Sequence, residues 1–181
     1  MPSRPVSSAD RGRTLVGGVG YTSLRDGSAG PLLVQRLNGT LGPDVDVEDL
    51  SYSPIDVMFL LQRSRPAYAR AIFVGAVARG APSGTIRVSR WDPEPEPPEA
   101  VQGRVAEAVA GVISLENLLH INAHFKALPP EVTLIEIEPE DESWGEGLTP
   151  TMERAMGEVA ALLRGETFAT AGAAGAGAGG G

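Results

Sequence analysis

Short apolar stretches recur along the chain, and polar or glycine-rich segments separate them. Five stretches have the length of strands: residues 15–19, 44–50, 71–77, 85–90 and 132–138. The most apolar run is 71–77, which predicts the central strand of a sheet. Polar and apolar positions alternate in the second and fourth stretches, so we expect a solvated face on the second and an edge position for the fourth.

Segments with helical signals alternate with these strands. Ser53, Ser114 and Thr149 are candidate N-caps, and Pro follows both Ser53 and Thr149 at the first helical position. The helices are expected at 28–38, from Ser53 onward, at 101–109 as a short stretch, from Ser114 to before Pro129, and at 152–163. The acidic, proline-rich residues 92–99 are expected to form an extended surface loop.

This alternation predicts an α/β fold, a three-layer α/β/α sandwich around a mostly parallel, twisted sheet of about five strands. The crossovers between parallel strands should be right-handed. We expect a single domain over residues 13–164. Residues 1–12 are expected to be a flexible leader, and the Ala/Gly-rich residues 165–181 a disordered tail.

The composition narrows the classes of function. Hydrophobic residues make up 42% of the 181 residues, which is enough for a core. The net charge of −8 argues against nucleic acid as a partner, because phosphate binding needs clustered Lys and Arg. The chain has no cysteine, so disulfides and thiolate metal sites are excluded. No apolar run approaches the ~20 residues that cross a bilayer, and we expect a cytoplasmic protein without membrane insertion.

The first strand ends in a glycine-rich turn, Gly18-Val19-Gly20, which leads to the first helix. A strand, such a turn and a helix open many parallel α/β domains, and the turn borders the crevice where ligands bind. A dinucleotide fingerprint would need a third glycine where Ser23 stands. We therefore do not expect nucleotide binding.

Four segments of the chain form an ordered set of motifs. They read Gly18–Tyr21 with Asp26–Gly30, Gly75–Val77 with Ser83–Thr85, Gly111–Leu119, and Gly147–Pro150. The set resembles the hydrogenase maturation proteases, metal-binding endopeptidases that trim the C-terminal tail of the nickel-iron hydrogenase large subunit. The resemblance spans residues 13–164 and implies the α/β fold of that family.

In that family an acid in the first loop, an aspartate ending the central strand and a histidine opening a later helix bind the metal and recognise nickel. The resemblance aligns these positions with Gly27, Gly75 and Gly111. Because glycine has no side-chain donor atom, the resemblance implies no metal ligand and no catalytic residue there, and we expect no cofactor. The candidates for a residual pocket are Gly20, Tyr21, Asp26 and Asp49.

The two histidines of the chain, His120 and His124, are four residues apart, and Glu116 lies four residues before His120. On one helix these three side chains would share a face, which suits a relocated metal site. The other interpretation is a solvated or partly buried helix face, because the Glu that follows the first His in zinc proteases is missing.

We therefore expect a non-catalytic protein of the maturation-protease type that binds a nickel-iron hydrogenase large subunit or its assembly factors. A protein can keep the fold that recognises a partner after it has lost its catalytic residues, because fold and site are separable. The alternative is an active metal-dependent endopeptidase that removes the C-terminal tail of the precursor with relocated ligands, among Asp26, Asp49, His120 and His124. A third interpretation is a small-molecule-binding α/β domain with no link to hydrogenases.

Overall fold

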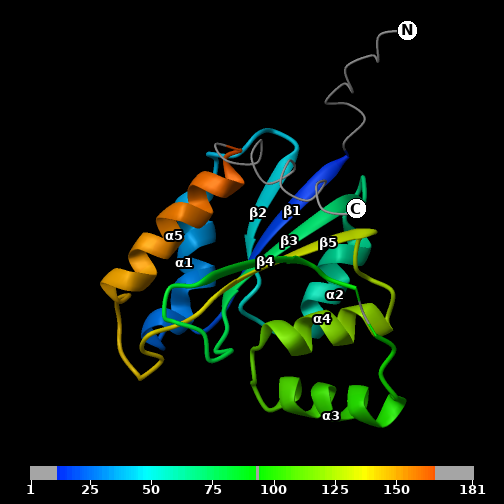
Figure 1. Ribbon diagram of the computed structural model, residues 1–181. Helices are drawn as coiled ribbons and strands as arrows, with labels where there is room; N and C mark the ends of the chain where they lie inside the picture. The colour runs from blue at the N-terminus through cyan, green and yellow to red at the C-terminus, as the bar shows by residue number, and fades with distance from the viewer. Residues whose placement is uncertain (1–11, 93, 166–181) are drawn as a thin grey trace, which may run out of the picture.

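A five-stranded sheet runs through the middle of the molecule, and helices cover both of its faces (Figure 1). The computed structural model describes residues 12–92 and 94–165. The strands lie in the order β2-β1-β3-β5-β4. Their bounds are β1 (Arg13–Val19), β2 (Val45–Asp49), β3 (Tyr68–Ala76), β4 (Ile86–Arg90) and β5 (Glu131–Ile137).

Four of the strands are parallel, and β4 is the exception. β1 pairs in parallel with β2 and β3, and β3 pairs in parallel with β5. β4 lies antiparallel to β5 at the edge of the sheet, with Ile86 opposite Ile137. The prediction of a mostly parallel sheet with β3 at its centre is therefore confirmed, and so is the edge position of residues 85–90.

The helices are divided between the two faces. On one face lie α1 (Ala29–Leu37) and α5 (Pro150–Leu163), and on the other α2 (Pro54–Arg63) and α4 (Leu115–His124), with α3 (Pro98–Val109) outside α4 (Figure 1). A 3-10 turn, η2 (Arg25–Ser28), leads into α1. In the described residues, 12–92 and 94–165, no helix has both the length and the apolar character needed to span a membrane.

Each face of the sheet has its own hydrophobic core. Successive residues of β3 point to opposite faces, so Val74 packs with Leu33 and Met156 under α1 and α5, whereas Phe73 packs with Leu118 under α2 and α4. All five of these side chains are buried. This explains why residues 71–77 are apolar without alternation, since a central parallel strand is covered on both faces.

Local signals placed the starts of three helices correctly. The side chains of Ser53, Ser114 and Thr149 each accept a hydrogen bond from a backbone N–H in the first turn of the following helix. Two helix bounds differ most from the expectation: α4 ends at His124 and does not continue to Pro129, and α3 begins at Pro98 and not at residue 101. Proline fits the first helical position, so the helix takes in the end of the segment that we expected to be an extended loop. All but the last residue of the expected leader, and all but the first residue of the expected tail, lie outside the described residues.

Candidate functional site

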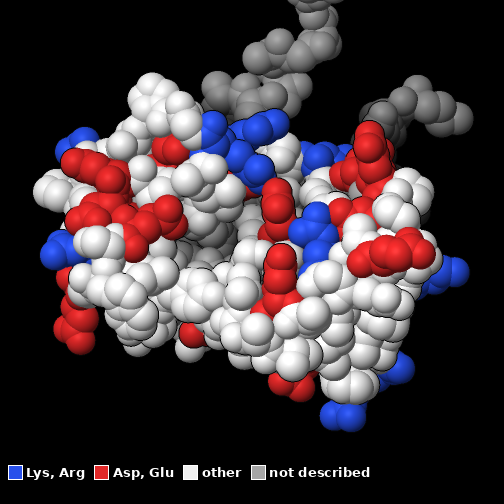
Figure 2. Space-filling model, turned by 90° about the horizontal axis from the view of Figure 1, so that it is seen from below, with Lys and Arg blue, Asp and Glu red and all other residues white. Residues whose placement is uncertain are grey.

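A cavity of about 660 Å³ opens where β1 and β3 end. The chain leaves β1 toward β2 and leaves β3 toward the opposite edge of the sheet, so the cavity lies at the switch point of the topology. Figure 2 looks at this end of the molecule and shows a hollow near its centre, with basic and acidic side chains around it. This is the position at which open α/β sheets bind their ligands.

The cavity has an apolar floor and a charged border. Its walls come from the turn after β1 with η2, the segment after β3, β4, β5, the start of α4 and the loop after β5. The apolar lining includes Val19, Leu24, Val77, Trp91, Ile113, Leu115, Leu119 and Leu134. The polar lining includes Tyr21, Arg79, Arg87, Ser89, Ser114, Glu116, His120, Glu136 and Glu142.

Tyr21 joins two of these walls. Its hydroxyl accepts a hydrogen bond from the N–H of Ile113 at 2.5 Å and donates one to the carbonyl oxygen of Gly111 at 3.0 Å. The backbone N–H of Tyr21 donates to Gly27 at 3.0 Å. The turn after β1 is thereby tied both to η2 and to the segment before α4. Gly20 and Tyr21, two of the four residues proposed for a residual pocket, do line the cavity.

The three glycines at the expected metal-ligand positions all belong to segments that border the cavity. Gly27 lines it, Gly75 directly precedes the lining residue Ala76, and Gly111 accepts the Tyr21 hydrogen bond. A Cβ atom on Gly27 would lie 3.0 Å from the Cβ of Leu24. A Cβ atom on Gly75 would lie 3.1 Å from the carbonyl oxygen of Val19.

Asp26 lies away from the cavity and serves the fold. Its side chain is fully buried and accepts hydrogen bonds from the backbone N–H groups of Glu140 at 2.9 Å, Asp141 at 3.1 Å and Thr149 at 2.8 Å. The hydroxyl of Thr149 donates a fourth bond at 2.9 Å. These donors already use the carboxylate, so Asp26 is a structural anchor for the loop between β5 and α5.

Asp49 is also separated from the cavity. It is exposed at the end of β2 and accepts a hydrogen bond from the N–H of Ser51 at 2.9 Å. It lines a different hollow, which it shares with Pro31, Gln35 and Asn38 of the α1 region. The structure therefore does not bring Asp26 and Asp49 together with Gly20 and Tyr21.

Glu116, His120 and His124 lie on α4 as expected, but they do not converge on one point. Glu116 and His120 line the cavity, whereas His120 and His124 line a second hollow beside Lys126. The ring of His124 packs edge-on against Phe125. Within residues 12–92 and 94–165, no group of three or more His, Asp or Glu side chains is placed to hold a metal ion. The donor set therefore does not fit the metal that the family resemblance implies.

Ion pairs hold the cavity border together. Arg79, just after β3, donates to the buried Glu136 of β5 at 2.7 Å and to Glu116 of α4 at 3.3 Å. The bond to Glu136 raises the pKa of Arg79 above its usual value. Glu138 accepts from the backbone N–H groups of Arg79 and Gly80, and the first of these bonds is the main reason that the pKa of Glu138 is lowered.

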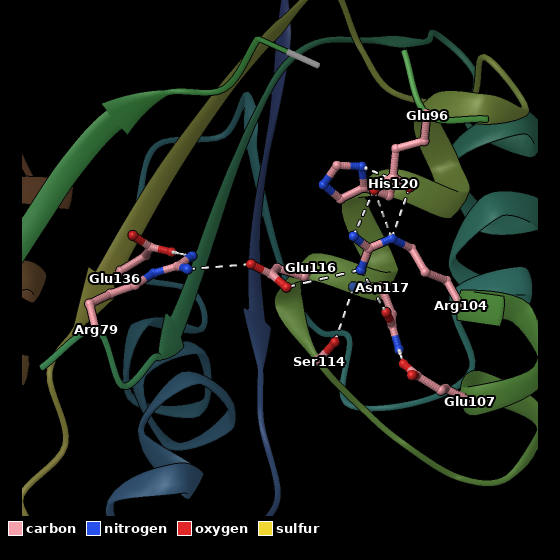
Figure 3. Close-up of polar contacts among 9 residues, drawn as sticks. All are labelled: Arg79, Glu96, Arg104, Glu107, Ser114, Glu116, Asn117, His120 and Glu136. Carbon is pink, nitrogen blue, oxygen red and sulfur yellow. Dashed lines mark hydrogen bonds and ion pairs between the residues drawn. The ribbon is translucent and has the colours of Figure 1, made fainter. Parts of the chain in front are cut away.

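The network continues onto α3 (Figure 3). Arg104 donates to both oxygens of Glu96 and to the side-chain oxygen of Asn117, and it lies 4.0 Å from Glu116. Glu96 in turn lies 3.3 Å from Nδ1 of His120, and the Arg104 bonds lower the pKa of Glu96. Glu116 and His120 are thus already engaged with partners of this chain, and the line of alternating charges fixes α3 and α4 against the sheet.

Sequence reasoning missed the charged border of the cavity. Arg87 and Trp91 point to the cavity from β4 and its end, and Arg79 follows β3 directly. One signal could have indicated the β4 wall: residues 87, 89 and 91 are two apart, so an edge strand presents them on one face. Nothing in the local sequence indicated Glu142, which reaches the cavity from the loop after β5.

No protein-family model and no curated protein sequence matches the chain. Several solved structures do match it. Over 85% of this chain and 97% of the other, it is similar to a hydrogenase 2 maturation peptidase from Thaumarchaeota archaeon SCGC_AB-539-E09, with 26% identity and a TM-score of 0.59. The chain has the hydrogenase maturation protease fold. The resemblance inferred from the four motifs is confirmed.

Two Escherichia coli structures share this fold. The hydrogenase maturating endopeptidase HybD is 24% identical, with a TM-score of 0.58 over 86% of this chain and 94% of its own. The endopeptidase HycI is 21% identical, with a TM-score of 0.61 over 84% of this chain and 90% of its own. In the present chain, three of the four motif segments border the cavity, so the hydrogenase maturation protease fold places them around one site.

Proposed function

We propose that this protein is a non-catalytic relative of the hydrogenase maturation proteases that binds a nickel-iron hydrogenase large subunit or one of its assembly factors. The proposal rests on glycine, as Gly27, Gly75 and Gly111, at the three positions where the family resemblance places the ligands, in segments that border the cavity. Glycine offers no donor atom to a metal, so the hydrolytic chemistry of the family has no ligand set at this site.

The shape and lining of the cavity support a binding role. Its walls are fixed by Tyr21 on one side and by Arg79 and its two glutamate partners on the other. A pre-organised cavity with an apolar floor and a charged border suits recognition of a peptide segment, because little ordering is needed on binding. Arg87 stands at this border, and no ion pair within 4.0 Å is found for it in the described part of the chain.

The test is incubation of a purified hydrogenase large-subunit precursor with this protein, with and without added nickel, followed by intact-mass analysis. We expect an unchanged precursor mass and co-elution of the two proteins on gel filtration. A mass loss equal to removal of the C-terminal tail would overturn the non-catalytic assignment and favour the relocated-ligand endopeptidase. Separate elution of the two proteins, repeated with the assembly factors of the same host, would overturn the binding role.

A charge-reversal pair locates the binding surface. Arg87→Glu should weaken binding of the precursor at least tenfold, because it places a carboxylate at the cavity border beside Glu136 and Glu116. Arg65→Glu changes the net charge by the same amount on an exposed residue just before β3, at the opposite end of the sheet. Equal effects of the two substitutions would show that the cavity is not the binding site.

A further inference from the structure

The loop between β5 and α5 carries the most exposed aromatic side chain among the described residues. Trp144 is 82% exposed, although Trp is among the side chains whose burial stabilises a protein most. Trp91, the other tryptophan of the chain, packs against the core under α2 and α4. Single exposed apolar side chains on flexible loops are common and need no functional explanation. Exposure of Trp144 indicates a binding role only if the loop that carries it is rigid.

Buried Asp26 fixes both ends of this loop. The carboxylate accepts from the N–H groups of Glu140 and Asp141 at the start of the loop and from the N–H and hydroxyl of Thr149 at its end. The N–H of Asp26 donates to the carbonyl oxygen of Asp141 at 3.0 Å. Residues 140–149 therefore form a closed segment that is held on a fully buried charge.

The residue next to Trp144 is fixed as well. Gly145 donates its N–H to the carbonyl oxygen of Ser23 at 3.0 Å, and its own carbonyl oxygen accepts the N–H of Arg25 at 3.1 Å. Leu24 and Gly145 form a parallel β-bridge. The backbone at Trp144 is thus held in place while its side chain extends into solvent. Pre-organisation of this kind lowers the entropy lost when a partner binds.

The surroundings of Trp144 are acidic. Glu140, Glu142 and Glu146 are exposed, and no ion pair within 4.0 Å is found for any of them in residues 12–92 and 94–165. Arg25 pairs with Asp141 at 3.3 Å. Figure 2 shows acidic side chains gathered at the side of the molecule where this loop and α5 lie in Figure 1. The part of a partner that meets this loop is therefore expected to carry Lys or Arg, because like charges across an interface are disfavoured.

The loop also adjoins the cavity. Glu142, two residues before Trp144, lines the cavity together with Leu24 and Gly27. The Oε1 atom of Glu142 lies 3.8 Å from the place where a Cβ on Gly27 would stand. A protein bound at the cavity mouth would therefore meet the loop that carries Trp144 at Glu142.

We propose that Trp144 is the anchor of a docking surface for a protein partner, and that it inserts into an apolar socket bordered by Lys or Arg on that partner. The assignment rests on the binding role proposed above and names the residue that carries it. Tryptophan is the residue most typical of interface hot spots, and the acidic side chains around it steer a basic partner and fix its orientation. Val109 on α3 is also 82% exposed, but it is small and lies on the outermost helix, so it serves as the matched control.

The test measures binding of the hydrogenase large-subunit precursor by surface plasmon resonance for the wild type, Trp144→Ala, Trp144→Phe and Val109→Ala. We expect a loss of at least 30-fold for Trp144→Ala, seen mainly as faster dissociation, and a smaller loss for Trp144→Phe. Val109→Ala should bind like the wild type. Glu140→Gln with Glu146→Gln should instead slow association and reduce its dependence on salt.

The outcomes separate the two proposals. If the wild type binds the precursor and Trp144→Ala binds equally well, the anchor assignment is overturned and the binding role stands. If the wild type binds neither the precursor nor an assembly factor, the binding role is overturned and the anchor falls with it. Because substitution of an exposed side chain leaves the core intact, unchanged thermal unfolding of Trp144→Ala would show that a loss of binding is not a loss of fold.

A spectroscopic reading is independent of the affinity. The chain has two tryptophans, so labelling it with 5-fluorotryptophan should give two ¹⁹F signals, which the variants Trp144→Phe and Trp91→Phe assign. We expect the Trp144 signal to shift and broaden when unlabelled precursor is added. A Trp144 signal that stays at its solvent-exposed position in the complex would contradict the anchor.

Discussion

The glycines where β1 meets α1 and the glycines on the cavity wall differ in what surrounds them. A Cβ on Gly18 would collide with the backbone of Gly30, and a Cβ on Gly30 would collide with the backbone of Val19. By contrast, a Cβ on Gly27 or Gly75 would meet its nearest neighbour at 3.0 and 3.1 Å.

The difference shows which glycines the fold requires. Close contact of strand and helix leaves no space for a side chain at Gly18 and Gly30, and the neighbours are backbone atoms that cannot move aside. At Gly27 the neighbour is a side chain, and at Gly111 no atom lies within 4 Å of the added Cβ. Packing therefore explains the junction glycines. At Gly111 the left-handed backbone, with a φ of +91°, favours glycine although space is free. At Gly27 and Gly75 a Cβ would need only a small shift of its neighbour.

The largest expected effect is that of Gly30→Ala. The added methyl group meets backbone atoms of both Val19 and Val74, so we expect the free energy of unfolding to fall by about 3 kcal/mol or more. Urea titration followed by circular dichroism measures it. Gly157→Ala is the matched control, because Gly157 is an exposed helical glycine of α5 with nothing within 4 Å, and this change should stabilise by up to about 1 kcal/mol. A fall of less than 1 kcal/mol for Gly30→Ala would remove the distinction between the two groups.

Asp26→Ala should have the next largest effect. It leaves three backbone N–H groups and the Thr149 hydroxyl without their acceptor in a buried place, which should lower the free energy of unfolding by about 2–3 kcal/mol. It should also release the loop that carries Trp144, seen as faster amide hydrogen exchange at residues 140–146. Asp49→Ala is the control on an exposed carboxylate and should change stability by less than about 0.5 kcal/mol. Slow exchange in Asp26→Ala would mean that other contacts hold the loop.

Gly75→Ala should lower the free energy of unfolding by less than Gly30→Ala does, but by a measurable amount. Its methyl group would lie 3.1 Å from the carbonyl oxygen of Val19, a distance that a shift of a few tenths of an ångström relieves. We expect a loss of about 1 kcal/mol in the free energy of unfolding, at the low end for an overfilled site. Thermal unfolding of Gly75→Ala and Gly30→Ala, measured under the same conditions, checks which substitution destabilises the protein more. A loss as large as that of Gly30→Ala would place Gly75 with the junction glycines.

The smallest expected effect concerns Glu142 above Gly27. Burial raises the pKa of Glu142, with Asp26 and Glu138 adding to the shift. A raised carboxyl pKa means that the folded protein disfavours the ionised form, so the penalty is present at neutral pH and fades as the pH falls through that pKa. Glu142→Gln should stabilise by a few tenths of a kcal/mol at pH 7, since solvent screens an exposed side chain, and by nothing at pH 3. Thermal unfolding of the wild type and Glu142→Gln between pH 3 and pH 7 measures this effect, with Glu146→Gln as the control. A stabilisation by Glu142→Gln that grew as the pH fell would contradict the raised pKa of Glu142.

Much of the fold could be predicted from the sequence, because the signals are local. The capping residues Ser53, Ser114 and Thr149 and the apolar run 71–77 act over a few neighbours, and each was found where expected. The wrong prediction for the start of α3 also has a local cause. Proline is common both in extended segments and at the first position of a helix, so the sequence around Pro98 is compatible with either.

Less of the candidate site could be predicted, because its parts come from distant segments. Asp26 stands next to the expected ligand position Gly27, and local reasoning placed both in one pocket. The structure instead buries Asp26 under a loop more than 110 residues away in the chain, at Glu140 and Asp141. Asp49 faces a different hollow because β2 lies outside β1.

The sequence by itself determined the alternation of strands and helices, the caps, the family resemblance and the three glycines at the expected ligand positions, since these depend on residue type and local spacing. Only the tertiary structure decided that Tyr21 joins Gly111, that Glu142 stands over Gly27, and that Trp144 is held rigid yet exposed. The order of the strands and the docking of the loop after β5 create those contacts, and no local pattern encodes which distant segments meet.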